Sequence, residues 1–312
     1  MTKLNRLGNS NYITLLGHLG AIITVSAWGA SFVFTKVLME DGGFTPVEVY
    51  VYRFAVAYLL LLCFTFKKIF ANNWKDELNL MICGVCAGSL YFITENYALK
   101  FTTTSNVSLL ASISPIFTTI LMGIVFRERI KFGVILGSII AFIGVGCIIF
   151  SNGEGFEIKP KGDLLALSAA ISWAVYSIVV KKLIPIYNSL FITRKLFFYG
   201  VITAIPLLMM QPEAYHFHLL LDFTHTEYIY SFLFLIVLCS VMAYLIWNET
   251  MKVLGPVTAN NYLYAQPLVT MIIAALMINE NITMLGYIGC VLIIGGLIIS
   301  DKLKENKRFI RK

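Results

Sequence analysis

The chain has 312 residues, of which 58% are hydrophobic and 13% are charged. A soluble domain is about 45–50% apolar and about 25% charged, so this composition excludes an ordinary soluble protein. The net charge of +7 does not indicate a nucleic-acid partner. The basic residues lie in short connections and in the C-terminal tail, and not on one face interleaved with aromatic residues.

Ten apolar runs predict ten transmembrane helices, because a bilayer core about 30 Å thick requires about twenty apolar residues in a helix. The runs occupy residues 16–36, 46–66, 79–99, 104–125, 131–150, 163–183, 189–210, 228–249, 256–278 and 283–301. A polar stretch at residues 151–161 separates the first five from the last five. The predicted fold class is an all-α integral membrane protein with two halves of five helices.

The lysine and arginine residues predict the orientation of these helices. With the N-terminus inside, the cytoplasmic stretches hold 17 of the 24 basic residues and the outer stretches hold 4. The other three, Arg53, Arg194 and Lys195, lie within spans. Because basic residues are retained on the cytoplasmic side, we expect a multi-pass protein of the inner cell membrane with both termini in the cytoplasm. We expect Arg194 and Lys195 to reach the cytoplasmic interface.

The two halves repeat one another. A shift of 152 residues pairs Asn96 with Asn248, Lys100 with Lys252, Pro115 with Pro267, Glu128 with Glu280, Ile130 with Ile282, Gly137 with Gly289 and Gly144 with Gly296. Shifts of 145 and 141 pair Trp28 with Trp173 and Arg53 with Arg194. Each half has an odd number of spans, so the second half must cross the membrane in the opposite direction. Inverted repeats of this kind are typical of secondary transporters.

These repeated residues resemble the EamA repeat of the drug/metabolite transporter superfamily. The first copy has Trp28-Gly29-Ala30-Ser31-Phe32 with Lys36, then Pro46, Arg53, Pro115, Glu128, Gly137 and Gly144. The second has Trp173-Ala174 with Lys181 and Arg194, then Pro267, Glu280, Gly289 and Gly296. It lacks the glycine after the tryptophan and has Tyr187 where Pro46 would repeat. The two halves are therefore not expected to make identical contacts.

The resemblance implies a ten-helix secondary-active transporter that often exports amino acids or related amphipathic compounds, coupled to protons or to exchange. We expect one repeat at 13–150, an inverted repeat at 162–301 and a basic cytoplasmic tail at 302–312. The expected partners are a small-molecule substrate, the lipid bilayer, and a proton or counter-substrate. No cofactor is expected, and the chain is expected to be a monomer or a homodimer.

Polar residues share one helical face in three of the spans. The faces are Thr24, Trp28, Ser31 and Thr35 in the first span; Ser105, Ser108, Ser112, Pro115 and Thr119 in the fourth; and Asn260, Tyr264, Pro267 and Met271 in the ninth. Polar groups are costly against lipid, so these faces line a wet cavity or form hydrogen bonds between helices. Pro115 and Pro267 each free a carbonyl in the preceding turn, which either kinks the helix or faces the substrate.

Charged residues complete the set of candidate pathway residues. We expect Arg53 to anchor a carboxylate of the substrate or of the protein, the alternative being an ion pair with Glu48 or Glu95. Glu95 and Glu249 are expected at opposite gates, and Glu95 is expected to titrate. The full pathway set is Trp28, Ser31, Arg53, Tyr91, Glu95, Asn96, Ser108, Ser112, Pro115, Trp173, Tyr176, Tyr244, Asn248, Asn260, Tyr264 and Pro267.

Other motifs have structural interpretations. Glu128 and Glu280 each precede a helix, whose free N–H groups a carboxylate can cap. The glycines spaced by three, four and seven residues in the fifth and tenth spans predict close helix packing. The stretch of residues 211–227 holds His216, His218, Asp222 and His225, which we interpret as a polar loop and not as a metal site.

Two other functions remain as alternatives to a carrier. A non-transporting receptor or scaffold would have no need of an inverted repeat. An intramembrane enzyme would need clustered catalytic residues at membrane depth. The aspartates lie in loops or at the ends of spans, at Asp41, Asp76, Asp163, Asp222 and Asp301, so we do not expect an enzyme.

Overall fold

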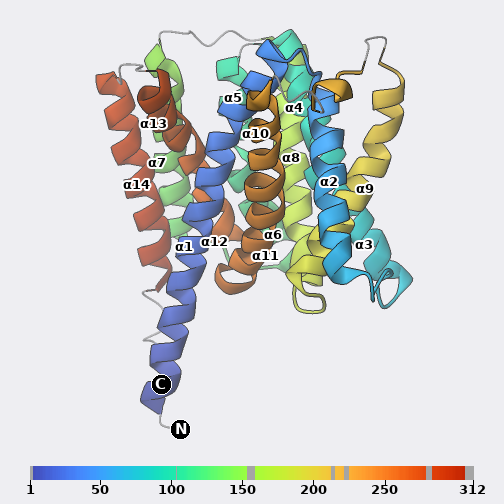
Figure 1. Ribbon diagram of the computed structural model, residues 1–312. Helices are drawn as coiled ribbons and strands as arrows, with labels where there is room; N and C mark the ends of the chain where they lie inside the picture. The colour runs from blue at the N-terminus through green and yellow to red at the C-terminus, as the bar shows by residue number, and fades with distance from the viewer. Residues whose placement is uncertain are drawn as a thin grey trace.

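The computed structural model describes residues 3–102, 104–152, 159–211, 215–220, 225–278 and 283–305, a bundle of helices with no strand in these ranges (Figure 1). The first half contains α1 (Lys3–Lys36), α2 (Pro46–Thr65), α3 (Trp74–Gly84), α4 (Leu90–Phe101), α5 (Thr104–Ala111), α6 (Ser114–Phe126) and α7 (Phe132–Ile149). The second contains α8 (Pro160–Leu183), α9 (Ser189–Met209), α10 (Thr226–Phe234), α11 (Ala243–Leu254), α12 (Pro256–Asn261), α13 (Gln266–Ile278) and α14 (Met284–Glu305).

Nine segments of the described chain are long and apolar enough to cross a membrane. They match nine of the ten predicted spans. The predicted ninth span, 256–278, is divided into α12, the 3₁₀ segment η6 (Tyr262–Ala265) and α13. It still completes five helical crossings in the second half, so the ten-helix fold class is confirmed. The last helix is longer than predicted, because α14 continues to Glu305, inside the expected tail.

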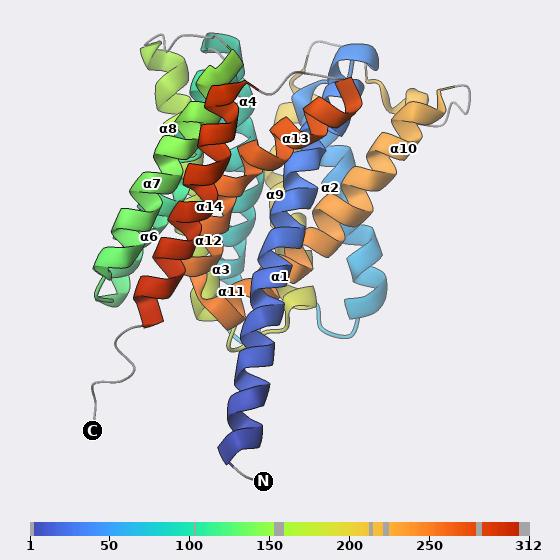
Figure 2. The same ribbon diagram turned by 90° about the vertical axis from the view of Figure 1, so that its left-hand side faces the viewer.

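Helices α7 and α14 lie side by side in both views (Figures 1 and 2) and make the inverted symmetry visible. A Cβ atom placed on Gly137 would lie 2.4 Å from the Gly296 carbonyl oxygen, and one placed on Gly144 would lie 2.7 Å from the Gly289 carbonyl oxygen. Gly137 corresponds to Gly289 in the repeat, and Gly144 to Gly296. Gly137 therefore contacts the equivalent of Gly144, and Gly144 contacts the equivalent of Gly137, as a two-fold relation requires. The predicted close packing is confirmed.

The same irregularities recur in both halves. The third span of each half contains a π-helical segment, η2 (Val85–Ser89) between α3 and α4, and η5 (Leu235–Met242) between α10 and α11. The fourth span of each half is interrupted just before its proline, since Pro115 and Pro267 lie in the first turns of α6 and α13. A proline fits a first turn because its missing N–H has no helical partner there.

The halves are interleaved and do not lie apart. Helix α1 packs on α11 of the second half, and α8 packs on α4 of the first half. Helix α2 packs on its own repeat mate, α9. The buried aromatic residues described below therefore come from both halves.

The capping role predicted for Glu128 is wrong. Helix α7 has Lys131 at its N-cap position, with no side-chain cap. Glu128 instead forms an ion pair with Lys181 in the last turn of α8, because that ammonium group is within direct reach of the carboxylate. Glu280 lies outside the described residues.

Candidate functional site

Six aromatic residues from α1, α4, α8 and α11 pack together inside the bundle. The Trp28 ring centroid lies 5.5 Å from that of Trp173, 5.3 Å from Tyr244 and 5.1 Å from Trp247. Tyr91 and Tyr176 add contacts to Trp173 at 5.6 and 5.1 Å. We call these six residues the aromatic cluster. Large aromatic rings in an interior contact bury much apolar area and prefer the tilted, edge-on arrangements seen here.

Trp247 is not among the pathway residues predicted from the sequence. Its side chain is fully buried, and its indole Nε1 has no hydrogen-bond partner among the described residues. It lies three residues after Tyr244, so the helical period alone places the two on one face. This three-residue spacing is the sequence feature from which Trp247 could have been predicted.

Hydrogen bonds connect the aromatic cluster to the two π-helical segments. Trp28 Nε1 donates to the Cys239 carbonyl oxygen of η5 at 3.0 Å. Tyr244 Oη donates to the Ala87 carbonyl oxygen of η2 at 3.3 Å. The wider π turn changes the backbone hydrogen-bonding pattern, and such turns are frequent at functional sites. Each half thus presents a backbone acceptor to an aromatic donor from the other half.

Two buried asparagines orient the rings from the second half. Trp173 Nε1 donates to Asn260 Oδ1 at 2.9 Å, and Asn260 Nδ2 donates to the Pro256 carbonyl oxygen at 2.8 Å. Tyr176 Oη donates to Asn248 Oδ1 at 3.2 Å, and Asn248 Nδ2 donates to Thr193 Oγ1 at 2.9 Å. Both amides form hydrogen bonds between helices. Their role in the substrate pathway stays a prediction.

Arg53 of α2 reaches η5, the π-helical segment that also accepts the hydrogen bond from Trp28. Its side chain is 5% exposed, and its Nε donates to Ser240 Oγ of η5 at 2.5 Å. Its guanidinium carbon lies 4.9 Å from the centre of the Phe54 ring. Trp28 and Arg53 therefore bind adjacent residues of the same π-helical segment, Cys239 and Ser240.

No carboxylate among the described residues forms an ion pair with Arg53. Glu48 accepts hydrogen bonds from the His216 backbone N–H at 2.7 Å and contacts His216 Nδ1 at 3.0 Å. Glu95 Oε1 accepts from Tyr91 Oη at 2.9 Å. The alternative that pairs Arg53 with Glu48 or Glu95 is therefore wrong. A guanidinium has five N–H donors, and within the described ranges Arg53 uses one of them, on Ser240.

The two predicted gating glutamates differ in their surroundings. Glu95 is partly buried and, through Tyr91, is connected to the aromatic cluster. The Glu249 side chain is 54% exposed, pairs with Lys252 at 3.7 Å and accepts a hydrogen bond from Ser189 Oγ at 2.6 Å. Only Glu95 is brought to the site. The side chain of Asn96 lies outside the described residues.

The remaining predicted pathway residues do not join the aromatic cluster. Ser31 Oγ donates to the Trp28 carbonyl oxygen at 2.7 Å, and Ser112 Oγ donates to the Ser108 carbonyl oxygen at 2.8 Å, so these serines bond within their own spans. Tyr264 packs in a separate buried group at α7 and α14. Pro115 is buried and Pro267 is partly buried, each at its helix interruption.

Arg194 and Lys195, which were predicted to reach the cytoplasmic interface, are covered by protein, with exposed fractions of 2% and 4%. Arg194 donates to the carbonyl oxygens of Thr65 and Lys68, both at 2.6 Å. Lys195 forms an ion pair with Glu77. The end of α2 leaves carbonyl groups without helical partners, and Arg194 satisfies them. The connection from α2 to α3 is thus held against α9.

The buried pair of Lys195 and Glu77 leads to a prediction. Replacing Glu77 by glutamine, or Lys195 by methionine, should each lower the free energy of unfolding by about 3–5 kcal/mol, because the partner keeps a buried charge. The double variant should lose much less than the sum of the two. Denaturant unfolding of the four proteins in one detergent measures this coupling. Additive effects would show that the two charges act independently.

Known proteins resemble this chain along nearly its whole length. An uncharacterized transporter of Archaeoglobus fulgidus is 29% identical over 288 residues, which covers 91% of this chain and 96% of the relative. A probable amino-acid metabolite efflux pump of Escherichia coli is 27% identical over 292 residues, covering 90% and 93%. A solved crystal structure has the same fold, with a TM-score of 0.74 at 18% identity over 94% of this chain and 97% of that chain.

The model of the EamA-like transporter family matches residues 15–150 and 160–300, one match in each half. These matches confirm the resemblance seen in the repeated residues and the two-repeat architecture. Together with the apolar helices, they make the chain a multi-pass membrane protein. The chain belongs to the EamA-like transporter family.

Proposed function

We propose that this transporter exports a small amphipathic metabolite with a carboxylate, such as an amino acid or a related compound, by alternating access. The observation that carries the proposal is Arg53, a buried cation with no carboxylate partner among the described residues. A buried charge is costly unless it is paired, so a substrate carboxylate is a fitting partner. The efflux-pump relative of Escherichia coli supports the same substrate class.

The aromatic cluster is suited to bind the apolar and ammonium parts of such a substrate. Its rings offer apolar contact to a side chain and negatively polarised faces to an ammonium group. Trp247 Nε1 adds a buried donor that no group in the described part of the chain accepts. An amino acid would thus have its carboxylate at Arg53 and its apolar and ammonium parts against the rings. We place both termini in the cytoplasm, from the distribution of basic residues.

Flux measurements with matched compounds test this function. The purified protein is reconstituted in liposomes, and the uptake of amino acids is compared with that of their carboxamides, which keep the ammonium group but lose the carboxylate. We expect saturable flux of the acids and at least about tenfold weaker flux of the amides, because a hydrogen bond to a charged group contributes about 1.5–3 kcal/mol. No saturable flux for any carboxylate compound overturns the proposal.

We further propose that Glu95 carries the coupling proton. Its carboxylate accepts a hydrogen bond from Tyr91, whose ring packs on Trp173, so a change in its protonation would be felt by the aromatic cluster. Replacing Glu95 by glutamine should abolish flux driven by a pH gradient and preserve counter-substrate exchange. Glu249→Gln is the control, because that carboxylate is exposed and paired with Lys252. Unchanged pH-driven flux in the Glu95 variant rules out the proton-carrying role.

A further inference from the structure

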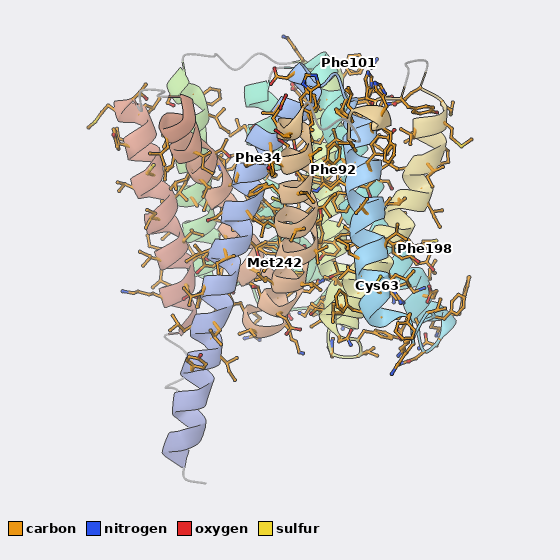
Figure 3. All side chains as sticks on the ribbon, viewed as in Figure 1. Phe34, Cys63, Phe92, Phe101, Phe198 and Met242 are labelled. Atoms are coloured by element: carbon orange, nitrogen blue, oxygen red, sulfur yellow. The ribbon has the colours of Figure 1, made fainter. Side chains whose placement is uncertain are left out.

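The connection between α2 and α3 exposes three aromatic side chains. Phe66 is 61% exposed, Phe70 is 72% exposed and Trp74 is 79% exposed. In water such rings would turn toward the protein, because their exposure is unfavourable. The connection lies at the end of the bundle where α1 begins and α14 ends, just beyond Cys63 of α2 in Figure 3.

The backbone of this connection faces the protein instead. Arg194 of α9 binds the carbonyl oxygens of Thr65, Lys68 and Ile69 at 2.6–3.1 Å. The Ala71 N–H donates to Glu77 Oε2 at 2.7 Å, and the Asn72 N–H donates to Tyr187 Oη at 2.8 Å. The outward position of the rings is therefore built into the fold. Of the three residues, Trp74 is of the type enriched at membrane–water interfaces, where its ring has both apolar and polar surroundings.

The charges on the connection are unbalanced. Lys67 and Lys75 are exposed and have no ion pair among the described residues. The two nearest acids are engaged elsewhere: Asp76 accepts a hydrogen bond from Tyr187 Oη at 2.7 Å, and Glu77 pairs with Lys195. Two ammonium groups without an ion pair among the described residues thus lie on the same short connection as three exposed rings.

We propose that residues 66–75 bind the headgroup of an anionic phospholipid, with Lys67 and Lys75 on the phosphate and with Phe66, Phe70 and Trp74 at the base of the acyl chains. The charge of the two lysines selects an anionic lipid over a zwitterionic one, since each basic residue near such a surface contributes to binding. The site is independent of the transported substrate. Arg194 connects it to α9, so lipid binding stabilises the contact between α2 and α9.

Tryptophan fluorescence gives a direct test. Of the four tryptophans, Trp28, Trp173 and Trp247 are buried and Trp74 is exposed. Phosphatidylglycerol with brominated acyl chains should quench the purified wild-type protein in detergent and should quench Trp74→Phe much less. Brominated phosphatidylcholine should need a higher concentration for the same quenching.

The lysines are tested by substitution. Lys67→Gln with Lys75→Gln should remove the preference for phosphatidylglycerol, which we expect to be about fivefold for each lysine. Lys252→Gln is the control, because this lysine at the end of α11 is exposed but already pairs with Glu249. Equal quenching by both lipids in the wild type, or an equal loss of preference in the control variant, overturns the proposal. If the quenching of Trp74 by brominated lipid decreases as the protein concentration rises, a second copy of the chain covers this surface. That result would also overturn the proposal.

Discussion

Replacing Gly296 by alanine is expected to lower the unfolding temperature of the protein, whereas the same change at Gly295 is not. A Cβ atom on Gly296 would lie 2.6 Å from the Ala141 backbone nitrogen and 2.6 Å from the Gly137 carbonyl oxygen. Both are backbone atoms, so α7 and α14 would have to separate. Overpacking of this kind costs about 1–3 kcal/mol.

Gly295 provides a control within the same turn of α14. A Cβ atom there would meet nothing within 4 Å. Alanine favours a helix by about 0.8–1.0 kcal/mol over glycine, so Gly295→Ala should preserve or raise the unfolding temperature. Thermal unfolding of the three proteins in one detergent measures the difference. Equal unfolding temperatures for the two variants would contradict the close contact of α7 with α14.

The second large effect is expected at Arg53. Replacing it by glutamine should reduce the flux of a carboxylate substrate roughly 10–150-fold, because a hydrogen bond to a charged group contributes about 1.5–3 kcal/mol. The unfolding temperature of the Arg53→Gln variant should not be lower than that of the wild type. The guanidinium is buried, with one hydrogen bond and no ion pair to the part of the chain that the structure describes, and removing an unpaired buried charge relieves a desolvation cost.

The combination of lost flux and preserved stability distinguishes a binding role from a structural one. Arg53→Lys keeps the charge but not the flat, forked set of donors, and it should recover only part of the flux. Ser240→Ala should reduce the flux less than Arg53→Gln or Arg53→Lys, because it removes only the hydroxyl that positions Nε of Arg53. Liposome flux and thermal unfolding are measured on each variant. A large drop in unfolding temperature with Arg53→Gln would assign this residue to the fold.

The amino-acid sequence determined the architecture, because its signals are local or periodic. The free energy of moving a helix into lipid depends on about twenty consecutive residues, so the spans could be counted. The repeat predicted close packing at Gly137 and Gly144, and it placed Pro115 and Pro267 at equivalent positions of the two halves. These predictions needed no knowledge of which helices pack together.

Only the tertiary structure decided which partner each charged or polar group has. Arg53 and Arg194 are equivalent in the repeat, yet one binds Ser240 and the other binds carbonyl groups at the end of α2. Glu128 pairs with Lys181, which is 53 residues away in the chain. A hydrogen bond or ion pair requires atoms within a few ångströms, and residues from distant segments reach that distance only through the packing of whole helices. The sequence therefore predicts the two inverted halves, and the packing between them leaves Arg53 with no carboxylate partner in the described ranges.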